Sequence, residues 1–194
     1  ATLDDNPYID PDYLTTLALL PHWRYEQLRH GDWRVFAGQF FSQWREAHHV
    51  ADLGTPEGVR WFRSLDWGRN QPGCVLWWAI LPDGRLYGRA ELKFQGLDEP
   101  EVARRIHAID TALTIRASYT AGDPAIFAKT GATHQTPQFT GQSIGDTLAF
   151  YGVPLVKADN DRVNGWGRCC ALLRDAPDGR PWQIVHPNCR YLIR

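Results

Sequence analysis

The amino-acid sequence predicts an α/β fold, in which helices flank a mixed β-sheet made of an antiparallel three-strand meander and further parallel strands. Three strand-like segments, joined by short turns, follow one another between residues 61 and 94. Beyond residue 100 the apolar residues recur at helical spacing, and helices then alternate with strands. With 194 residues and a mass of 22.1 kDa, the chain is long enough for one domain and an additional segment.

The meander consists of strands expected at 61–66, 74–81 and 86–94. The second of these is a nearly unbroken apolar run, which is typical of a buried central strand. Residues 69–73 (RNQPG) form the first turn, and Pro-Asp-Gly at 82–84 is the signal of a type I turn. Parallel neighbours need a long crossover, so connections this short predict that the three strands pair antiparallel in sequence order.

Helices and strands alternate after the meander. Val102, Ile106 and Ile109 lie on one face of the first helix, and Gly152 closes a later one. Strands that are joined through a helix become parallel neighbours, so the second half is expected to add parallel strands to the sheet. The expected elements are a helix at 102–113, a strand at 115–121, a helix at 143–151, a strand at 154–159, a helix at 162–174 and a strand at 182–186.

Residues 1–50 differ from the rest and are typical of loop and helix. A helix capped by Asp10 or Asp12 is expected to run to His30, where Gly31 ends it. An irregular aromatic stretch follows at 33–44, and we expect it to pack on a larger body. The chain is therefore divided into a linking segment, 1–50, and a sheet domain, 51–194.

Composition excludes several classes of protein. A hydrophobic fraction of 43% with 9 Trp excludes disorder, collagen and coiled coil. No apolar run reaches the ~18 residues that a membrane span needs, and no signal peptide is expected. The net charge of −1 gives no hint of a polyanionic partner. The four cysteines contain no C-x-x-C motif, so they are expected to be buried free thiols in a reducing compartment.

Two aspartates follow predicted strands at positions where chemistry is expected. Asp66 ends the first strand, and Asp123 ends the fourth, between Gly122 and Pro124. Proline holds the preceding residue in extended backbone, which directs Asp123 away from its strand end. If the first and fourth strands are neighbours, the two carboxylates meet at one edge and repel each other unless a cation lies between them. Such oxygen ligands suit Mg²⁺ or Mn²⁺.

A purely structural interpretation of these aspartates is the alternative, and the pattern alone favours it. Aspartate is common at the ends of strands because its carboxylate begins turns and caps loops. Asp66 and Asp123 could serve only this purpose. The choice between the two interpretations depends on evidence beyond the local pattern.

Several segments along the chain occur together in a characteristic order. They are Asp-Trp-Gly at 66–68, the apolar run 74–81 with its Pro-Asp-Gly turn, LYGRAELKFQG at 86–96, GDPAIF at 122–127 and KADNDRVNGW at 157–166. Together they resemble the nuclease domain of phage terminase large subunits. Residues 31–41 are similar to that family's junction between its ATPase motor and its nuclease.

The resemblance implies an RNase H-like fold and a divalent-metal-dependent endonuclease, which cuts concatemeric viral DNA during genome packaging by two-metal phosphodiester hydrolysis. It makes Asp66 and Asp123 the catalytic acids and the ligands of two ions, Mg²⁺ or Mn²⁺. Residues 1–50 would be the tail of the ATPase motor, whose G-x-x-x-x-G-K-[ST] motif does not occur in this sequence. The implied partners are double-stranded DNA, the motor of the same polypeptide, the portal and the small terminase subunit, with no membrane. The implied location is the cytoplasm of the infected bacterial host or of a lysogen, docked at the procapsid portal.

Family members carry a third acid on a later helix. The sequence ends before any such motif, so the resemblance implies a nuclease domain truncated at its C-terminus and a fragment of weak or no activity. Asp159 or Asp161 is the candidate third metal ligand within the sequence, since Asp159 ends the predicted fifth strand. The stronger alternative is that one of them caps the helix that begins near Arg162.

Four basic residues near the expected crevice are candidate contacts to DNA phosphates: Arg69, Lys129, Arg162 and Arg168. No base-reading motif occurs, so binding is expected to be largely indifferent to sequence. A non-catalytic docking or DNA-clamping module of the packaging machine is the alternative function, and metal binding distinguishes it from a nuclease.

Two other features are expected to be structural. Gly-Gln-Ser-Ile-Gly at 141–145 matches the nucleophile elbow of esterases, but no convincing strand precedes it. Ser143 and Asp146 instead fit the capping box of a helix. Glu91 lies in the middle of the third strand, where we expect it to pair with an arginine.

Overall fold

The chain divides into two compact units, Ala1–Trp44 and Arg45–Arg194. The computed structural model describes residues 17, 28–29, 41–68, 71–129 and 141–193. The helix expected to end at His30 and most of the aromatic stretch lie outside these residues. Residues 45–50 belong to the second unit, in which Val50 forms an isolated parallel bridge with Val185.

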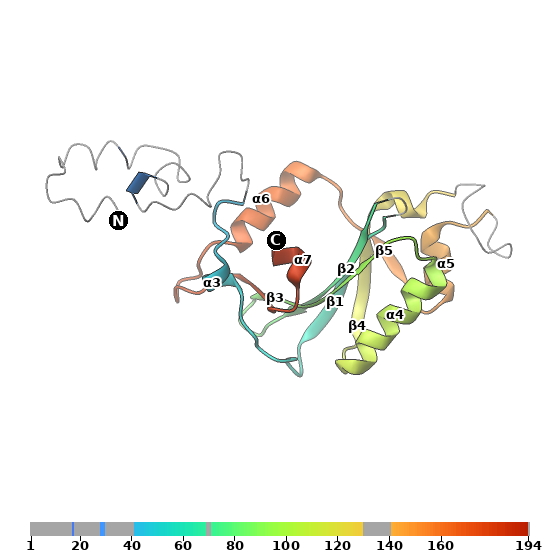
Figure 1. The fold of residues 1–194 in the computed structure, drawn as a ribbon, viewed down its shortest axis with the longest axis horizontal. Coiled ribbons are helices and arrows are strands. Elements are labelled where there is room, and N and C mark those ends of the chain that lie inside the picture. Colours follow the sequence, from blue (N-terminus) through green and yellow to red (C-terminus); the bar gives the residue numbers. More distant parts are fainter. Residues whose placement is uncertain (1–16, 18–27, 30–40, 69–70, 130–140, 194) are drawn as a thin grey trace, which may run out of the picture. The chain divides into compact units, whose positions relative to one another are not determined.

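The second unit is built on a six-stranded mixed sheet with the strand order β5-β4-β1-β2-β3-β6 (Figure 1). The strands are β1 (Arg60–Asp66), β2 (Gly73–Ile80), β3 (Leu86–Phe94), β4 (Ala117–Gly122), β5 (Leu155–Lys157) and β6 (Gln183–Val185). The first three pair antiparallel in sequence order, which confirms the predicted meander. The later strands all join in parallel: β4 pairs with β1, β5 with β4, and β6 with β3.

Helices lie on both faces of this sheet, with α4 and α5 on one side and α3, α6 and α7 on the other (Figure 1). The helical elements are α3 (Glu46–His49), α4 (Glu99–Ala112), the 3₁₀ turn η2 (Pro124–Phe127), α5 (Ile144–Phe150), α6 (Arg162–Leu172) and α7 (Arg190–Ile193). Three of these, α3, η2 and α7, have only four residues each, too few to show a helical period in the sequence. No helix among the described residues is long and apolar enough to cross a membrane.

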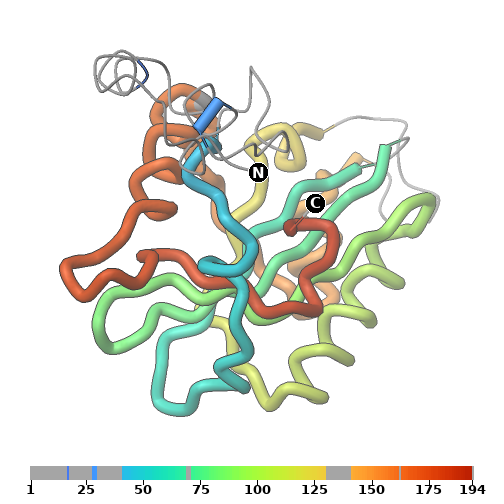
Figure 2. Tube along the Cα trace, turned by 60° about the vertical axis from the view of Figure 1, so that its left-hand side comes forward, coloured from blue at the N-terminus to red at the C-terminus, as the bar shows by residue number. Residues whose placement is uncertain are grey.

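The core lies between the sheet and α4. Val75, Trp77 and Ala79 alternate along β2 and are fully buried, where they meet Val102 and Ile106 of α4. Alternation along the strand places these side chains on one face of the sheet, and helical spacing places their partners on one face of α4. The residues between them on β2 therefore belong to the other face. There α7 turns back toward β3, as the red end of the tube in Figure 2 shows.

A largely buried ion pair joins the sheet to α4. Arg63 of β1 is 5% exposed, and its Nη1 donates to Oδ2 of Asp110 on α4 at 2.8 Å. The other oxygen of Asp110 accepts from Trp77 Nε1, also at 2.8 Å. Burial lowers the pKa of the Arg63 guanidinium, and the neighbouring Asp110 acts in the opposite direction. Asp110 thus holds β1, β2 and α4 together through a single carboxylate.

Candidate functional site

The two aspartates singled out by the sequence lie at the carboxyl ends of neighbouring strands. β1 and β4 run parallel, and the last residue pair in their register is Leu65 with Gly122. Asp66 and Asp123 are the next residues along the chain from that pair. Neighbouring strands lie about 4.8 Å apart, so these two acids begin from adjacent positions at one edge of the sheet. The condition that the sequence left open, that the first and fourth strands are neighbours, is met.

Asp66 is exposed, and the described part of the chain supplies it with no hydrogen-bond or ion-pair partner. Opposite it on β2 lies Cys74, which is its antiparallel partner. Burial raises the pKa of the Cys74 thiol to about 11, with further contributions from the negative charges of Glu91 and Asp66. The thiol therefore stays protonated at neutral pH. Because Asp66 is exposed and has no partner among the described residues, its carboxylate remains available to a ligand.

Asp123 has a structural task, and only one of its two carboxylate oxygens has a hydrogen-bond partner among the described residues. Its Oδ1 accepts a hydrogen bond from Ala125 N at 2.7 Å and thereby caps the turn η2. Its backbone, at φ −53° and ψ 136°, has the ψ of extended chain that a following proline favours. The capping interpretation is thus correct for one oxygen of this carboxylate. It does not exclude the second oxygen from binding a cation, so both interpretations fit the geometry.

Asp159 and Asp161 form a local network at the start of α6. Asp161 caps the helix: its Oδ1 accepts from Asn164 N at 3.1 Å, and its Oδ2 accepts from Asn164 Nδ2 at 2.7 Å. Asp159 accepts from the backbone of Asp161 at 3.0 Å. The predicted cap is confirmed for Asp161. Among the described residues, no three His, Cys, Asp or Glu side chains come together in a group that could hold a metal ion.

The turn after Asp66 depends on Gly68. A Cβ at this position would lie 2.1 Å from the carbonyl oxygen of Gln71 and 2.4 Å from the carbonyl carbon of Pro72. The chain therefore returns directly across Gly68 to begin β2, and only glycine leaves room for that backbone. This close approach explains the glycine of the Asp-Trp-Gly segment and fixes the loop beside the acid.

Gly68→Ala is accordingly expected to destabilise the domain by about 1–3 kcal/mol, because backbone must shift to admit the methyl group. Urea unfolding followed by tryptophan fluorescence measures the change. Gly165→Ala is the matched control, since Gly165 lies inside α6 with no atom within 4 Å of its added Cβ. That variant should gain up to about 1 kcal/mol from helix propensity. Equal stability of the Gly68 variant and the parent would contradict the close approach.

Two of the four predicted DNA contacts have described, exposed side chains. Lys129 is exposed just after η2, and Arg168 is exposed on α6. Arg162 is the first residue of α6, although its side chain is not among the described ones, and Arg69 lies outside the described residues. Lys93 and Lys157 also lie on strands of this sheet and were not predicted as DNA contacts. Lys93 is the register partner of Cys74, and Lys157 is the register partner of Gly122. Only this strand pairing, and nothing in the local sequence, places the two lysines near the acids.

Among the described residues Glu91 has no arginine partner, contrary to the prediction. Its two carboxylate oxygens accept from the backbone amides of Tyr191 and Leu192, at 2.8 and 3.0 Å. These are free N–H groups at the start of α7, which a carboxylate satisfies well. The contact spans about one hundred residues of sequence, and for this reason local pattern gave no sign of it.

Ser143 is a helix cap, as predicted. Its Oγ accepts from Asp146 N at 3.0 Å, while Asp146 accepts from Ser143 N at 3.1 Å. These hydrogen bonds lower the pKa of Asp146. Ser143 is 2% exposed, so it cannot serve as a nucleophile in the way the esterase motif requires.

The four cysteines are free thiols, but only Cys189 is fully buried. Cys74 and Cys170 are half-buried, and Cys169 is exposed, which corrects the prediction of uniform burial. Cys169 and Cys170 are neighbours on α6, and adjacent helical residues point in different directions, so both cannot face the core.

Neither a protein-family model nor a curated protein matches the chain in sequence. Solved structures do resemble it. The large terminase of a thermophilic bacteriophage, in complex with ADP, superposes with a TM-score of 0.63 and 18% identity over the whole chain. The chain spans 45% of the length of that protein.

Two further structures extend the resemblance. The nuclease domain of the P22 large terminase gives a TM-score of 0.59 with 16% identity, over 80% of this chain and 76% of that domain. The large terminase of bacteriophage HK97 gives a TM-score of 0.53 with 13% identity, over 95% of this chain and 42% of the other. The mixed sheet with its meander, parallel strands and flanking helices is therefore the RNase H-like fold of the large terminase nuclease domain.

Proposed function

We propose that this chain is a divalent-metal-dependent DNA endonuclease, acting as the nuclease domain of a phage terminase large subunit. The observation that carries the proposal is the pair formed by Asp66 and Asp123, which extend from adjacent positions at the carboxyl ends of β1 and β4. Open sheets of this type bind ligands at the carboxyl ends of their strands. The terminase nuclease fold of the chain supports the same activity.

The pair fits a divalent cation by its donor chemistry. Asp66 is exposed without a partner among the described residues, and Asp123 offers the oxygen that does not cap η2. Two adjacent carboxylates repel each other, and a bound Mg²⁺ or Mn²⁺ would remove that repulsion. Two such ions, when bound, would supply an activated water and offset the negative charge that develops on the phosphate oxygens. Asp66 and Asp123 are the two acids that we propose for this site, and no group of three potential ligand side chains occurs among the described residues.

The protein's own residues then bind and orient the DNA. We propose Lys129, Arg162 and Arg168, with Arg69, as contacts to its phosphates, because cations that contact phosphates set the register of a strand without reading its bases. The likeness to large terminases supports the further proposal that the chain cuts concatemeric viral DNA during packaging. On the same likeness we propose as partners an ATPase motor joined through residues 1–50, the portal and the small subunit, and as location the procapsid in the host cytoplasm.

Incubation of the purified chain with supercoiled plasmid tests the proposal. With Mn²⁺ or Mg²⁺ we expect slow conversion to nicked and then linear DNA, cut without sequence preference, because no group of three metal ligands occurs among the described residues. We expect no cleavage in EDTA. Tight DNA binding without any metal-dependent cleavage would favour the alternative, a non-catalytic DNA-clamping module. If the chain neither binds nor cleaves DNA, both the nuclease and the DNA-clamping function are contradicted.

A further inference from the structure

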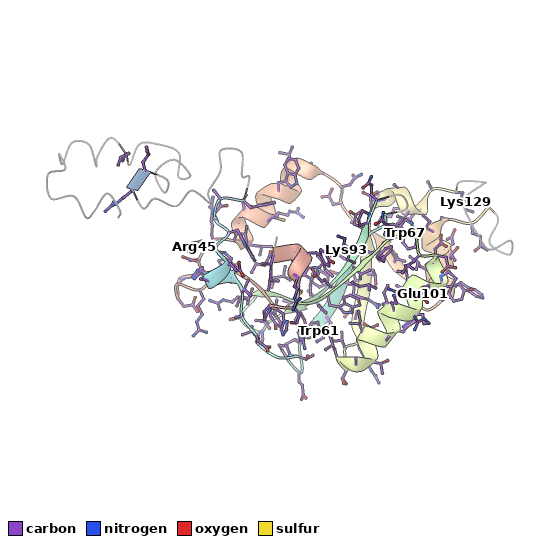
Figure 3. All side chains as sticks on the ribbon, viewed as in Figure 1. Arg45, Trp61, Trp67, Lys93, Glu101 and Lys129 are labelled. Carbon is purple, nitrogen blue, oxygen red and sulfur yellow. The ribbon has the colours of Figure 1, made fainter. Side chains whose placement is uncertain are left out.

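All three lysines of the chain lie near the edge of the sheet that carries the two acids, although the chain has 18 arginines spread over its whole length. Lys93 stands near the end of β3 and pairs with Cys74, which itself pairs with Asp66. Lys157 ends β5 and pairs with Gly122, the residue before Asp123. Figure 3 shows Lys93 and Lys129 toward the end of the strands that is opposite Trp61.

The pairing places the strand ends that carry the two acids between the strand ends that carry Lys93 and Lys157. Lys157 stands one strand away from Asp123, and Lys93 stands two strands away from Asp66. With neighbouring strands about 4.8 Å apart, these strand ends span about 19 Å. Because side chains alternate along a strand, Lys93 shares the face of Asp66, whereas Lys157 shares the face of Leu65. The two ammonium groups therefore approach the end of the sheet that carries the acids from opposite faces.

Each of these two lysines rests on an aromatic ring. Lys93 Nζ lies 4.1 Å from the centre of the Tyr191 ring, and Lys157 Nζ lies 5.6 Å from the centre of the Phe127 ring. A ring orders the ammonium group through a cation–π interaction, but it takes none of its three hydrogen-bond donors. Both lysines are exposed, Lys93 on the face of α7 and Lys157 on the opposite face beside η2.

The carboxylate that could neutralise Lys93 is engaged elsewhere. Glu91 stands two residues earlier on the same face of β3, but both of its oxygens bind backbone amides of α7. No ion pair to Lys93 or Lys157 occurs among the described residues. A pocket of about 240 Å³ opens beside Lys93 and Cys74, with Tyr191 and Leu192 in its wall. It provides an apolar surface against which a nucleotide can lie next to the acids.

We infer that Lys93 and Lys157 hold the DNA phosphates on either side of the one that lies at Asp66 and Asp123. The nucleotide on the Lys93 side then occupies the pocket beside Tyr191. This inference rests on the proposed function, because it takes DNA as the substrate. The two lysines position the strand and touch neither the scissile bond nor the ions.

The test is the salt dependence of DNA binding in EDTA, measured by fluorescence anisotropy with a labelled duplex of about three helical turns and the full chain. Each lost phosphate contact lowers the slope of log affinity against log salt by about 0.9. The DNA affinity of every variant falls as salt rises from about 50 to 200 mM. For the double variant Lys93→Gln with Lys157→Gln, this fall should be about 12-fold smaller than for the parent. The double Lys→Arg variant keeps both charges and should behave as the parent does.

Arg116→Gln is the matched control, since Arg116 is exposed and precedes β4 at the opposite end of the sheet. It should leave the slope unchanged. Thermal unfolding by circular dichroism verifies that every variant is folded. If the parent binds DNA and the Lys→Gln double variant keeps its slope, the role of the two lysines is contradicted while the nuclease proposal stands. If the parent does not bind DNA at all, the proposed function fails instead.

Discussion

Asp66→Asn and Asp123→Asn are each expected to weaken Mn²⁺ binding at least ~10-fold and to reduce plasmid cleavage by about 100-fold or more, since loss of even an outer-shell partner of a metal ligand costs ~10–100-fold in affinity or activity. A direct ligand should cost no less. Asparagine keeps the size of aspartate and still accepts the Ala125 amide hydrogen bond that caps η2. The fold should therefore remain intact. Mn²⁺ titration followed by electron paramagnetic resonance measures affinity independently of cleavage.

Asp161→Asn and Asp159→Asn are the matched controls. Asp161 accepts hydrogen bonds from Asn164 at the start of α6, and Asp159 supports it through the Asp161 backbone amide. We expect Mn²⁺ affinity close to that of the parent in both. A loss as large as that of Asp66→Asn in either one would identify it as the third ligand. Unchanged affinity in Asp66→Asn and Asp123→Asn would refute the assignment of the pair.

Asp110→Ala is expected to lower the free energy of unfolding by about 3–5 kcal/mol. Burying a charge costs free energy, and after the substitution no carboxylate offsets this cost for the buried Arg63. The substitution leaves the Arg63 guanidinium, 5% exposed, without its carboxylate and Trp77 Nε1 without its acceptor. Urea unfolding monitored by fluorescence gives the value, since Trp77 itself reports on the core.

Two further variants test whether the loss of stability comes from the unpaired charge of Arg63 or from a general destabilisation of α4. Glu101→Ala breaks the exposed ion pairs to Arg104 and Arg105 on the same helix, and it should change the urea midpoint far less. Adding Arg63→Met to Asp110→Ala removes the orphaned charge and should restore much of the lost stability. A double variant no more stable than Asp110→Ala would show that the buried charge is not the source of the loss.

Much of the fold could be predicted because its signals are local. The meander follows from two turns of a few residues, and the expected third strand, 86–94, coincides with β3 (Leu86–Phe94). The second half was predicted from helical spacing and glycine stops, so α5 and α6 lie where they were expected. The short elements η2 and α7 were missed because four residues cannot show a helical period.

The local sequence identified each acid of the candidate site separately, but it did not show that the two acids are neighbours. A proline after Asp123 and a strand before Asp66 marked both acids, but whether they stand side by side depended on the order of strands in the sheet. Lys93 and Lys157 carry no local signal at all, since each is an ordinary polar residue near the end of a strand. Glu91 was assigned the wrong partner for the same reason: its contact to α7 joins residues about one hundred positions apart.

The sequence by itself determined the longer helices and the strands of the sheet domain, the alternation that buries one face of β2, and the two acids as candidates for metal chemistry. These properties follow from backbone propensity and hydrophobic period, which act over a few residues. Only the tertiary structure decided that β1 lies beside β4, that Lys93 and Lys157 flank the acids, and that Asp110 joins three elements. Such pairings depend on the burial of apolar surface across the whole sheet, which no local stretch of sequence encodes.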